Sequence, residues 1–166
     1  MNRNEESQIR AIIVTVSDTR DESNDTSGDI LAELLMEIDA KILDRIIVTD
    51  DFENLRQTLY SLTETEANLI LTTGGTGFAE RDNTPEATLA VIERETPGIS
   101  EAMRFETAKN TKFAMLSRGV SGIRNKTLII NLPGSPKGVS ECFEVIKDVL
   151  PHAINLICGK IEHKKE

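Results

Sequence analysis

Short apolar runs alternate with segments of helical periodicity along this chain, and this alternation limits the fold more than any other feature. Each run is rich in β-branched residues and predicts a strand buried on both faces. Apolar residues recur at helical spacing over residues 31–38 and 52–62. The four runs are Arg10–Ser17, Ile42–Val48, Asn68–Thr73 and Thr127–Leu132. We therefore expect an α/β fold, a three-layer, doubly wound and mostly parallel sheet with helices on both faces.

A helical insert separates the third and fourth of these strands. Thr84 as N-cap and Pro85 at the first helical position predict a helix that runs to about Glu95 and stops at Pro97. Five further elements are expected: a helix over 98–110, a turn or short helix over 113–116, a short strand over 120–123, and two closing helices over 139–149 and 152–158.

Length and composition indicate one domain. The 166 residues are 39% apolar and 28% charged, which is an ordinary globular balance. We expect a single domain over 1–166, with an ordered core at about 10–160 and frayed ends. No apolar run approaches the roughly 20 residues of a membrane span, and the polar start does not resemble a signal peptide, so we expect a cytoplasmic protein. The net charge of −9 argues against nucleic acid or an anionic membrane as the main partner.

Cysteine and histidine are few and scattered. Cys142 and Cys158 form no CxxC pair and are expected to be reduced, with Cys142 partly buried in a helix. His152 and His163 lie near the C-terminus, which disfavours a zinc site and a Ser-His-Asp triad. Any chemistry must then rest on carboxylates, hydroxyls, backbone amides and basic side chains.

The charge is unevenly distributed. Residues 1–83 hold 7 basic and 18 acidic side chains, a net charge of −11, whereas residues 84–166 hold 12 and 10, a net charge of +2. Within residues 102–140, seven basic side chains stand against one acid, Glu106. Such a stretch indicates either a site for a small anion or a solvated face, and both readings stay open at this point.

The loops that follow the strands are the candidate ligand loops, because ligands of doubly wound sheets bind at the carboxyl ends of the strands. The third strand leads into Thr72-Thr-Gly-Gly-Thr-Gly77. Its glycines would let the backbone approach a phosphate, although the pattern is neither a Walker A loop nor G-x-G-x-x-G. A tight strand-to-helix connection explains the same glycines.

Two acidic positions lie in these loops. Asp82 precedes the Thr84 helix and is either a helix-dipole partner or a Mg²⁺ ligand. In Thr49-Asp50-Asp51, one carboxylate is expected to cap the following helix. We assign the cap to Asp51 and the crevice to Asp50, with the reverse assignment open. Two carboxylates at neighbouring strand ends suit metal-assisted phosphoryl or nucleotidyl transfer.

Two more loops carry polar groups. Ser17-Asp18-Thr19-Arg20 ends the first strand and is either an ordinary turn or part of the crevice. Pro133-Gly-Ser-Pro-Lys-Gly138 offers the N–H groups of Gly134 and Ser135 and the Ser135 hydroxyl. Lys137 lies at the end of a helix where the dipole disfavours a cation, and an anionic ligand would explain its position.

Five short motifs in this order resemble the molybdopterin-binding domain of molybdenum cofactor biosynthesis. They are Thr72–Gly77, Arg81-Asp82, Thr84–Leu89, Leu116-Ser-Arg118 and Leu132–Pro136. The resemblance covers about residues 10–160 and is strongest to the molybdopterin adenylyltransferases and the related protein B type. It implies that ATP reacts with molybdopterin in the presence of Mg²⁺. The products would be adenylylated molybdopterin and pyrophosphate, and metal insertion would follow.

The resemblance also implies roles for individual residues. Asp50 and Asp82 would be the catalytic acids and would hold Mg²⁺. Ser117 and Arg118 would lie at the molybdopterin end, at its terminal phosphate. The remaining nucleotide- and molybdopterin-binding residues would be Ser17, Asp18, Gly74, Gly75, Thr76, Gly77, Pro133, Gly134, Ser135 and Lys137.

Members of this family form trimers, or hexamers built from trimers, and the metal-insertion protein is a further expected partner. Two other functions fit the same residues. One is a molybdopterin-binding or carrier protein without turnover, and the other is a Mg²⁺-dependent nucleotide hydrolase. Intact Asp50 and Asp82 favour the transferase over the carrier.

Overall fold

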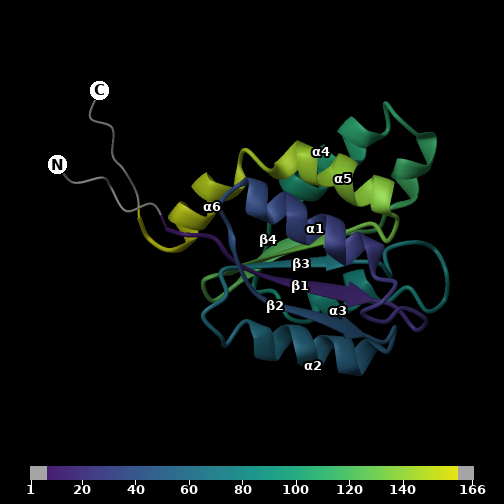
Figure 1. Ribbon diagram of the computed structural model, residues 1–166, viewed down its shortest axis with the longest axis horizontal. Coiled ribbons are helices and arrows are strands. Elements are labelled where there is room, and N and C mark those ends of the chain that lie inside the picture. The colour runs from purple at the N-terminus through teal and green to yellow at the C-terminus, as the bar shows by residue number, and fades with distance from the viewer. Residues whose placement is uncertain (1–6, 161–166) are drawn as a thin grey trace.

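The computed structural model describes residues 7–160, in which one mixed sheet has the strand order β2-β1-β3-β6-β5-β4 (Figure 1). The order reverses on either side of β1, which is the doubly wound arrangement expected from the sequence. β5 is antiparallel to both of its neighbours, and the other neighbouring pairs are parallel. The strands are β1 (Arg10–Val16), β2 (Lys41–Val48), β3 (Leu69–Thr73), β4 (Arg94–Glu95), β5 (Ser121–Arg124) and β6 (Thr127–Leu132).

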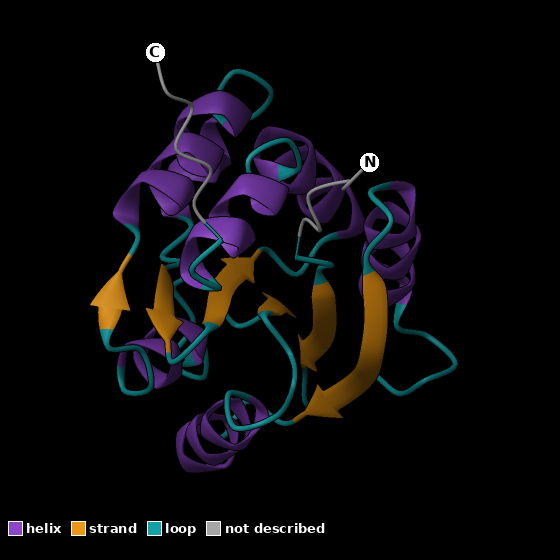
Figure 2. Cartoon of the chain, turned by 90° about the vertical axis from the view of Figure 1, so that its left-hand side faces the viewer, coloured by secondary structure: helices purple, strands orange, loops and turns teal. Residues whose placement is uncertain are grey.

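Helices cover both faces of the sheet (Figures 1 and 2). α1 (Thr26–Glu37), α4 (Pro97–Thr107), α5 (Pro136–Ile146) and α6 (Leu150–Ile157) lie on one face. α2 (Phe52–Leu62) and α3 (Thr84–Leu89) lie on the other, and a 3₁₀ helix, η1 (Lys112–Leu116), follows α4. Successive side chains of each strand alternate between the two cores: Ile13 packs on the first face and Ile12 on the second.

The helix expected from Thr84 to about Glu95 is shorter, and its last part is a strand. α3 ends at Leu89, and residues 94–95 form β4. The backbone N–H of Glu93 donates to Ile123 O at 2.8 Å, and that of Thr96 donates to Ser121 O at 2.9 Å. Pairing with β5 therefore satisfies these backbone groups in place of a longer helix. The other strands and helices lie where they were expected, apart from small shifts at their ends.

The N-cap of α3 is Asn83 and not Thr84. The Thr84 hydroxyl instead donates to Gly74 O at 2.9 Å. This bond ties residues 74–77, which we call the glycine loop, to the start of α3. The expected cap at Asp51 is confirmed, because its carboxylate accepts a hydrogen bond from Asn54 N at 2.8 Å at the start of α2. The Ser135 hydroxyl was expected to be available to a ligand, but it accepts a hydrogen bond from Gly138 N at 3.1 Å and caps α5.

Cys142 lies in α5 and is 7% exposed, so it is more deeply buried than the expected partial burial. Among residues 7–160, no helix is both long and apolar enough to span a bilayer. His163 and the chain ends expected to fray fall in residues 1–6 and 161–166, which lie outside the described residues.

Candidate functional site

The loops after β3 and β6 meet at the carboxyl edge of the sheet. Gly74 N donates to Leu132 O at 3.2 Å, and the Thr73 hydroxyl donates to Pro133 O at 2.8 Å. A Cβ atom placed on Gly134 would lie 3.2 Å from the Gly74 Cα atom. The two loops are therefore in backbone contact, at the topological position where such sheets bind ligands.

The glycine loop has a backbone that other residues adopt only with strain. Gly74 has φ +97° and Gly75 has φ +66°. A Cβ atom on Gly75 would also lie 3.1 Å from an Asp50 carboxylate oxygen. Glycine is thus needed both for the tight turn and for the close approach of Asp50.

Three acids and one arginine gather on one side of this loop. Asp50 N donates to the Asp18 carboxylate at 2.9 Å, and Arg81 Nε donates to the other oxygen of Asp18 at 2.7 Å. The hydrogen bond from Arg81 lowers the pKa of Asp18. Burial raises the pKa of Asp50, and the negative charges of Asp18 and Asp82 raise it further. The structure thus brings the Asp82 charge close enough to Asp50 to disfavour ionisation of the Asp50 carboxyl.

Asp82 is held by its own loop. Its carboxylate accepts a hydrogen bond from Ala79 N at 2.9 Å, and a Cβ atom on Gly77 would lie 2.9 Å from a carboxylate oxygen. Asp50 therefore lies beside Gly75, and Asp82 lies beside Gly77, farther along the same loop.

These carboxylates fit Mg²⁺, which proteins commonly bind through one or two carboxylates together with substrate phosphates. Burial and the charges of two neighbouring acids penalise the charged form of the Asp50 carboxylate, and a backbone hydrogen bond from Asp18 and the charge of Arg81 offset that penalty only in part. A cation would relieve that penalty. Within the same residues, no group of three or more His, Cys, Asp or Glu side chains could hold a metal ion. Asp50 and Asp82 would therefore hold the ion together with oxygen atoms of the substrate.

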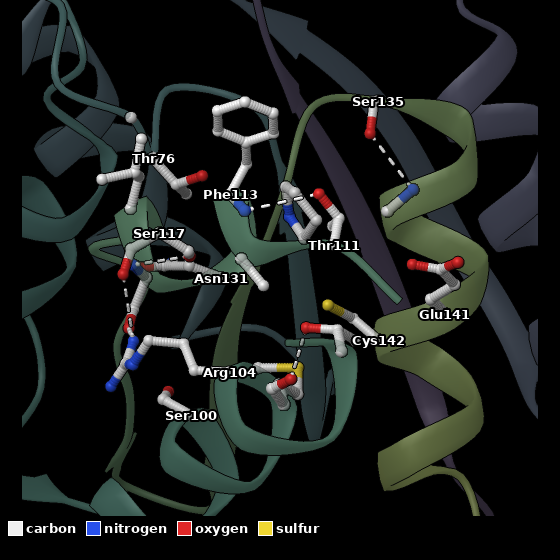
Figure 3. A pocket seen from close by; sticks show the side chains of 18 residues that line it. Thr76, Ser100, Arg104, Thr111, Phe113, Ser117, Asn131, Ser135, Glu141 and Cys142 are labelled. Carbon is white, nitrogen blue, oxygen red and sulfur yellow. Dashed lines mark hydrogen bonds between the residues drawn. The ribbon is translucent and has the colours of Figure 1, made fainter. Parts of the chain in front are cut away.

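A pocket of about 270 Å³ adjoins Thr76 and Gly77 of the glycine loop, and neither Asp50 nor Asp82 lines it (Figure 3). It is bounded by Thr76 and Gly77, by η1, and by side chains of α4 and α5 that face each other across it. Its lining residues are Thr76, Gly77, Ser100, Met103, Arg104, Thr107, Thr111, Phe113, Ala114, Leu116, Ser117, Gly119, Asn131, Pro133, Ser135, Gly138, Glu141 and Cys142. The wall is mostly apolar with a few polar groups, which is typical of a small-molecule site.

The residues implied by the resemblance divide between these two regions. Thr76, Gly77, Ser117, Pro133 and Ser135 line the pocket. Asp18, Asp50 and Asp82 form the acidic group, and Gly74 and Gly75 lie between the two regions. Ser17 accepts hydrogen bonds from Thr19 N and Arg20 N at 3.2 and 3.1 Å, so its hydroxyl caps a turn. Gly134 O accepts hydrogen bonds from Arg20 and Ser27 at 3.0 and 2.8 Å.

The basic residues of 102–140 do not gather into one patch. Arg124 lies at the far end of β5, which is the opposite edge of the sheet, and its guanidinium group stacks on Tyr60 beside Glu93. Lys137 is 80% exposed beside Glu141 and does not line the pocket. The Arg118 guanidinium group donates hydrogen bonds to Gly77 O, Asp82 O and the Glu86 carboxylate. Of the seven, only Arg104 lines the pocket, where it donates to Gly119 O at 2.7 Å.

Sequence reasoning did not single out Arg104, Asn131 or Glu141 as site residues. Asn131 had a usable signal, because it is a polar residue within the otherwise apolar strand β6. Its buried amide donates to Thr72 and Thr88 at 3.0 and 2.9 Å, and its oxygen accepts from Val120 N. Arg104 and Glu141 had no such signal, because each is one of several charged residues on an amphipathic helix.

Comparison with protein families gives a match to the probable molybdopterin-binding domain over residues 12–152. The chain belongs to the molybdopterin-binding domain family. It is 43% identical to a molybdopterin adenylyltransferase of Helicobacter pylori over 138 residues, which cover 81% of this chain and 78% of that protein. It is 47% identical to the molybdenum cofactor synthesis protein cinnamon of Drosophila melanogaster over 150 residues, 87% of this chain but 25% of that protein.

Solved structures of this family have the same fold. The molybdopterin biosynthesis enzyme MoaB of Thermus thermophilus superposes with a TM-score of 0.85 at 44% identity, with 92% of this chain and 98% of that chain covered. These matches confirm the expected fold and the family that the five motifs indicated.

Proposed function

We propose that this chain is a molybdopterin adenylyltransferase that transfers AMP from ATP to molybdopterin in a Mg²⁺-dependent reaction. One observation carries the proposal: the same glycine loop contacts the carboxylates of Asp50 and Asp82 and lines a mostly apolar pocket. Family membership and the similarity to adenylyltransferases over most of the chain support it. The carboxylate side suits a metal-bound triphosphate, and the pocket suits a pterin.

The chemistry needs no nucleophile from the protein. The terminal phosphate of molybdopterin attacks the α-phosphorus of ATP, a new P–O–P bond forms, and the bond to the β-phosphate breaks to release pyrophosphate. Cys142 lines the pocket, but burial raises the pKa of its thiol to about 11, so it stays protonated at neutral pH. The chain's contribution is to hold ATP and molybdopterin in contact, which makes a bimolecular step effectively unimolecular.

Each part of the site has a role in this reaction. Asp50 and Asp82 would hold Mg²⁺, which neutralises charge on the triphosphate when bound. Backbone N–H groups of the glycine loop and of Gly134 and Ser135 would bind phosphate oxygens. The Ser117 hydroxyl faces the pocket, where it would bind the substrate. Arg104 adds positive charge at the pocket wall.

We also propose a cytoplasmic location, a homotrimer or hexamer, and the metal-insertion protein as a partner. The first is supported by composition and charge, and the others by family resemblance. Gel filtration with light scattering tests the oligomer, and a mass of one chain would refute it.

Replacement of Asp82 by asparagine tests the metal role. We expect Asp82→Asn to abolish adenylylation while molybdopterin binding stays largely intact, because the carboxylate acts on the triphosphate. The assay combines molybdopterin, ATP and Mg²⁺ and measures adenylylated product and pyrophosphate. Glu80→Gln is the matched control, since it removes an exposed carboxylate from the same loop. Normal turnover by Asp82→Asn would refute the metal role.

The same assay on the unaltered protein separates the three functions. Molybdopterin binding without pyrophosphate release would indicate a carrier. ATP consumption without molybdopterin would indicate a nucleotide hydrolase. Product and pyrophosphate in equal amounts are the expected result for the transferase.

A further inference from the structure

Arg118 lies between η1 and β5, at the base of the loop that carries Asp82. Its Nε atom donates to Gly77 O at 2.7 Å, and its Nη2 atom donates to Asp82 O at 2.6 Å. Both Nη atoms also bond the Glu86 carboxylate, which projects from the first turn of α3. All three guanidinium nitrogens therefore donate to the protein, and the side chain is only about one-third exposed.

The two carbonyl groups that Arg118 joins are the two ends of one surface loop. Gly77 begins the loop and Asp82 ends it, so one planar guanidinium group closes the loop at its neck. The backbone N–H of Arg118 adds a third link, to Thr76 O at 2.9 Å. Inside the closed loop, Ala79 N donates to the Asp82 carboxylate at 2.9 Å. The direction of that carboxylate thus depends on a loop whose ends Arg118 ties together.

We propose that Arg118 is a positioning residue that orients Asp82 for Mg²⁺, and that it does not bind the molybdopterin phosphate. This inference rests on the proposed function. The fork of N–H groups on arginine spans two carbonyls at fixed spacing, whereas lysine presents one nitrogen and cannot span them. Partners that orient a metal ligand typically contribute tenfold or more to metal affinity or activity.

Arg118→Lys tests the role because it keeps the positive charge and removes the fork. We expect the Mg²⁺ concentration at half-maximal adenylylation to rise about tenfold to a hundredfold, while the Kd for molybdopterin changes less than about twofold. Arg124→Lys is the matched control. Arg124 also pairs with glutamates, Glu64 and Glu93, but lies at the opposite edge of the sheet.

A second readout needs no activity. In metal-free protein, the Ala79 amide is expected to exchange its proton about tenfold faster in Arg118→Lys than in the unaltered chain or in Arg124→Lys, because its hydrogen bond to Asp82 opens more often. NMR measures that rate residue by residue. If the unaltered chain makes no adenylylated product, the proposed function fails and the exchange rate still tests the loop closure.

Glu86→Gln distinguishes the two roles of Arg118 by sign. It removes the carboxylate that holds the guanidinium group, so a positioning role predicts that the Mg²⁺ concentration at half-maximal adenylylation rises on the same scale as in Arg118→Lys, with unchanged molybdopterin affinity. A phosphate ligand would instead be released from a competing anion, and molybdopterin would bind more tightly. Tighter binding in Glu86→Gln, or an unchanged Ala79 exchange rate in Arg118→Lys, would overturn the proposal.

Discussion

At the scale of single residues, Asp50 is the group whose titration matters most. Its pKa is raised chiefly by burial, then by the charges of Asp18 and Asp82, and the charge of Arg81 lowers it only in part. The folded chain therefore binds the Asp50 proton more tightly than the unfolded chain does. The metal-free protein loses that part of its stability as the pH rises through the raised pKa. Above that pKa, the charged carboxylate is available for a cation.

Asp18→Asn is expected to lower the pKa of Asp50, since it removes a neighbouring negative charge and frees Arg81 from its ion pair. The acid limb of Mg²⁺-dependent activity should then move to lower pH. A carboxyl-carbon NMR titration of metal-free protein measures the change directly. Glu53→Gln removes one charge from the start of α2 and should leave the Asp50 titration in place. An unshifted Asp50 titration in Asp18→Asn would contradict the electrostatic account.

At the scale of elements, the glycine loop joins β3 to α3 and contacts both halves of the site. Gly75 has a left-handed backbone and stands against Asp50 and Thr84. Gly98, in the first turn of α4, has no heavy atom within 4 Å of the position of an added Cβ. The two glycines therefore respond to the same substitution in opposite ways.

Gly75→Ala should destabilise the fold by at least about 1–2 kcal/mol, because alanine is strained at positive φ, and should reduce adenylylation as Asp50 is displaced. Gly98→Ala should change stability by less than about 1 kcal/mol, in the stabilising direction, because alanine loses less chain entropy on folding. Urea unfolding measures both, with activity assayed per folded molecule. Equal stability of the two variants would show that the loop tolerates a side chain.

How far the sequence predicts these elements depends on whether the deciding contacts are local. The strands and the cap at Asp51 were predictable, because apolar runs and capping side chains act over a few residues. The end of α3 was not, because β4 exists only through its pairing with β5, nearly 30 residues away in the sequence. The pocket escaped prediction for the same reason, since α4 and α5 meet only in the folded chain.

At the scale of the whole molecule, the uneven charge of the sequence becomes an uneven charge across the sheet. β2, β1 and β3 come from residues 1–83, and β6, β5 and β4 come from residues 84–166, so the strand order keeps the two halves apart. The acidic half carries Asp50 and Asp82, while most of the pocket wall comes from the near-neutral half. The acidic half therefore favours a cation, and the near-neutral half is the more favourable side for an anion.

Burial predicts how two phenylalanines differ. Phe143 is 1% exposed in the core beneath α5, and Phe113 is 67% exposed at the pocket. Phe143→Ala should lower the free energy of unfolding by about 3–5 kcal/mol, whereas Phe113→Ala should lower it by less than about 1 kcal/mol. Thermal and urea unfolding compare them. Similar losses in the two variants would mean that η1 contributes to the core.

The contact between Gly74 and Gly134 also constrains how this sequence can change over time. At Gly74 and Gly134 the loops after β3 and β6 touch backbone to backbone, and neither residue has a side chain that could absorb a shift. A larger residue at Gly134 pushes directly on the loop beside the carboxylates, and one at Gly74 meets Val16 O as well as a strained backbone. Neither glycine can therefore be replaced while the other loop keeps its conformation. New substrate preferences would therefore have to arise in the walls contributed by α4 and η1, where side chains can be exchanged one at a time.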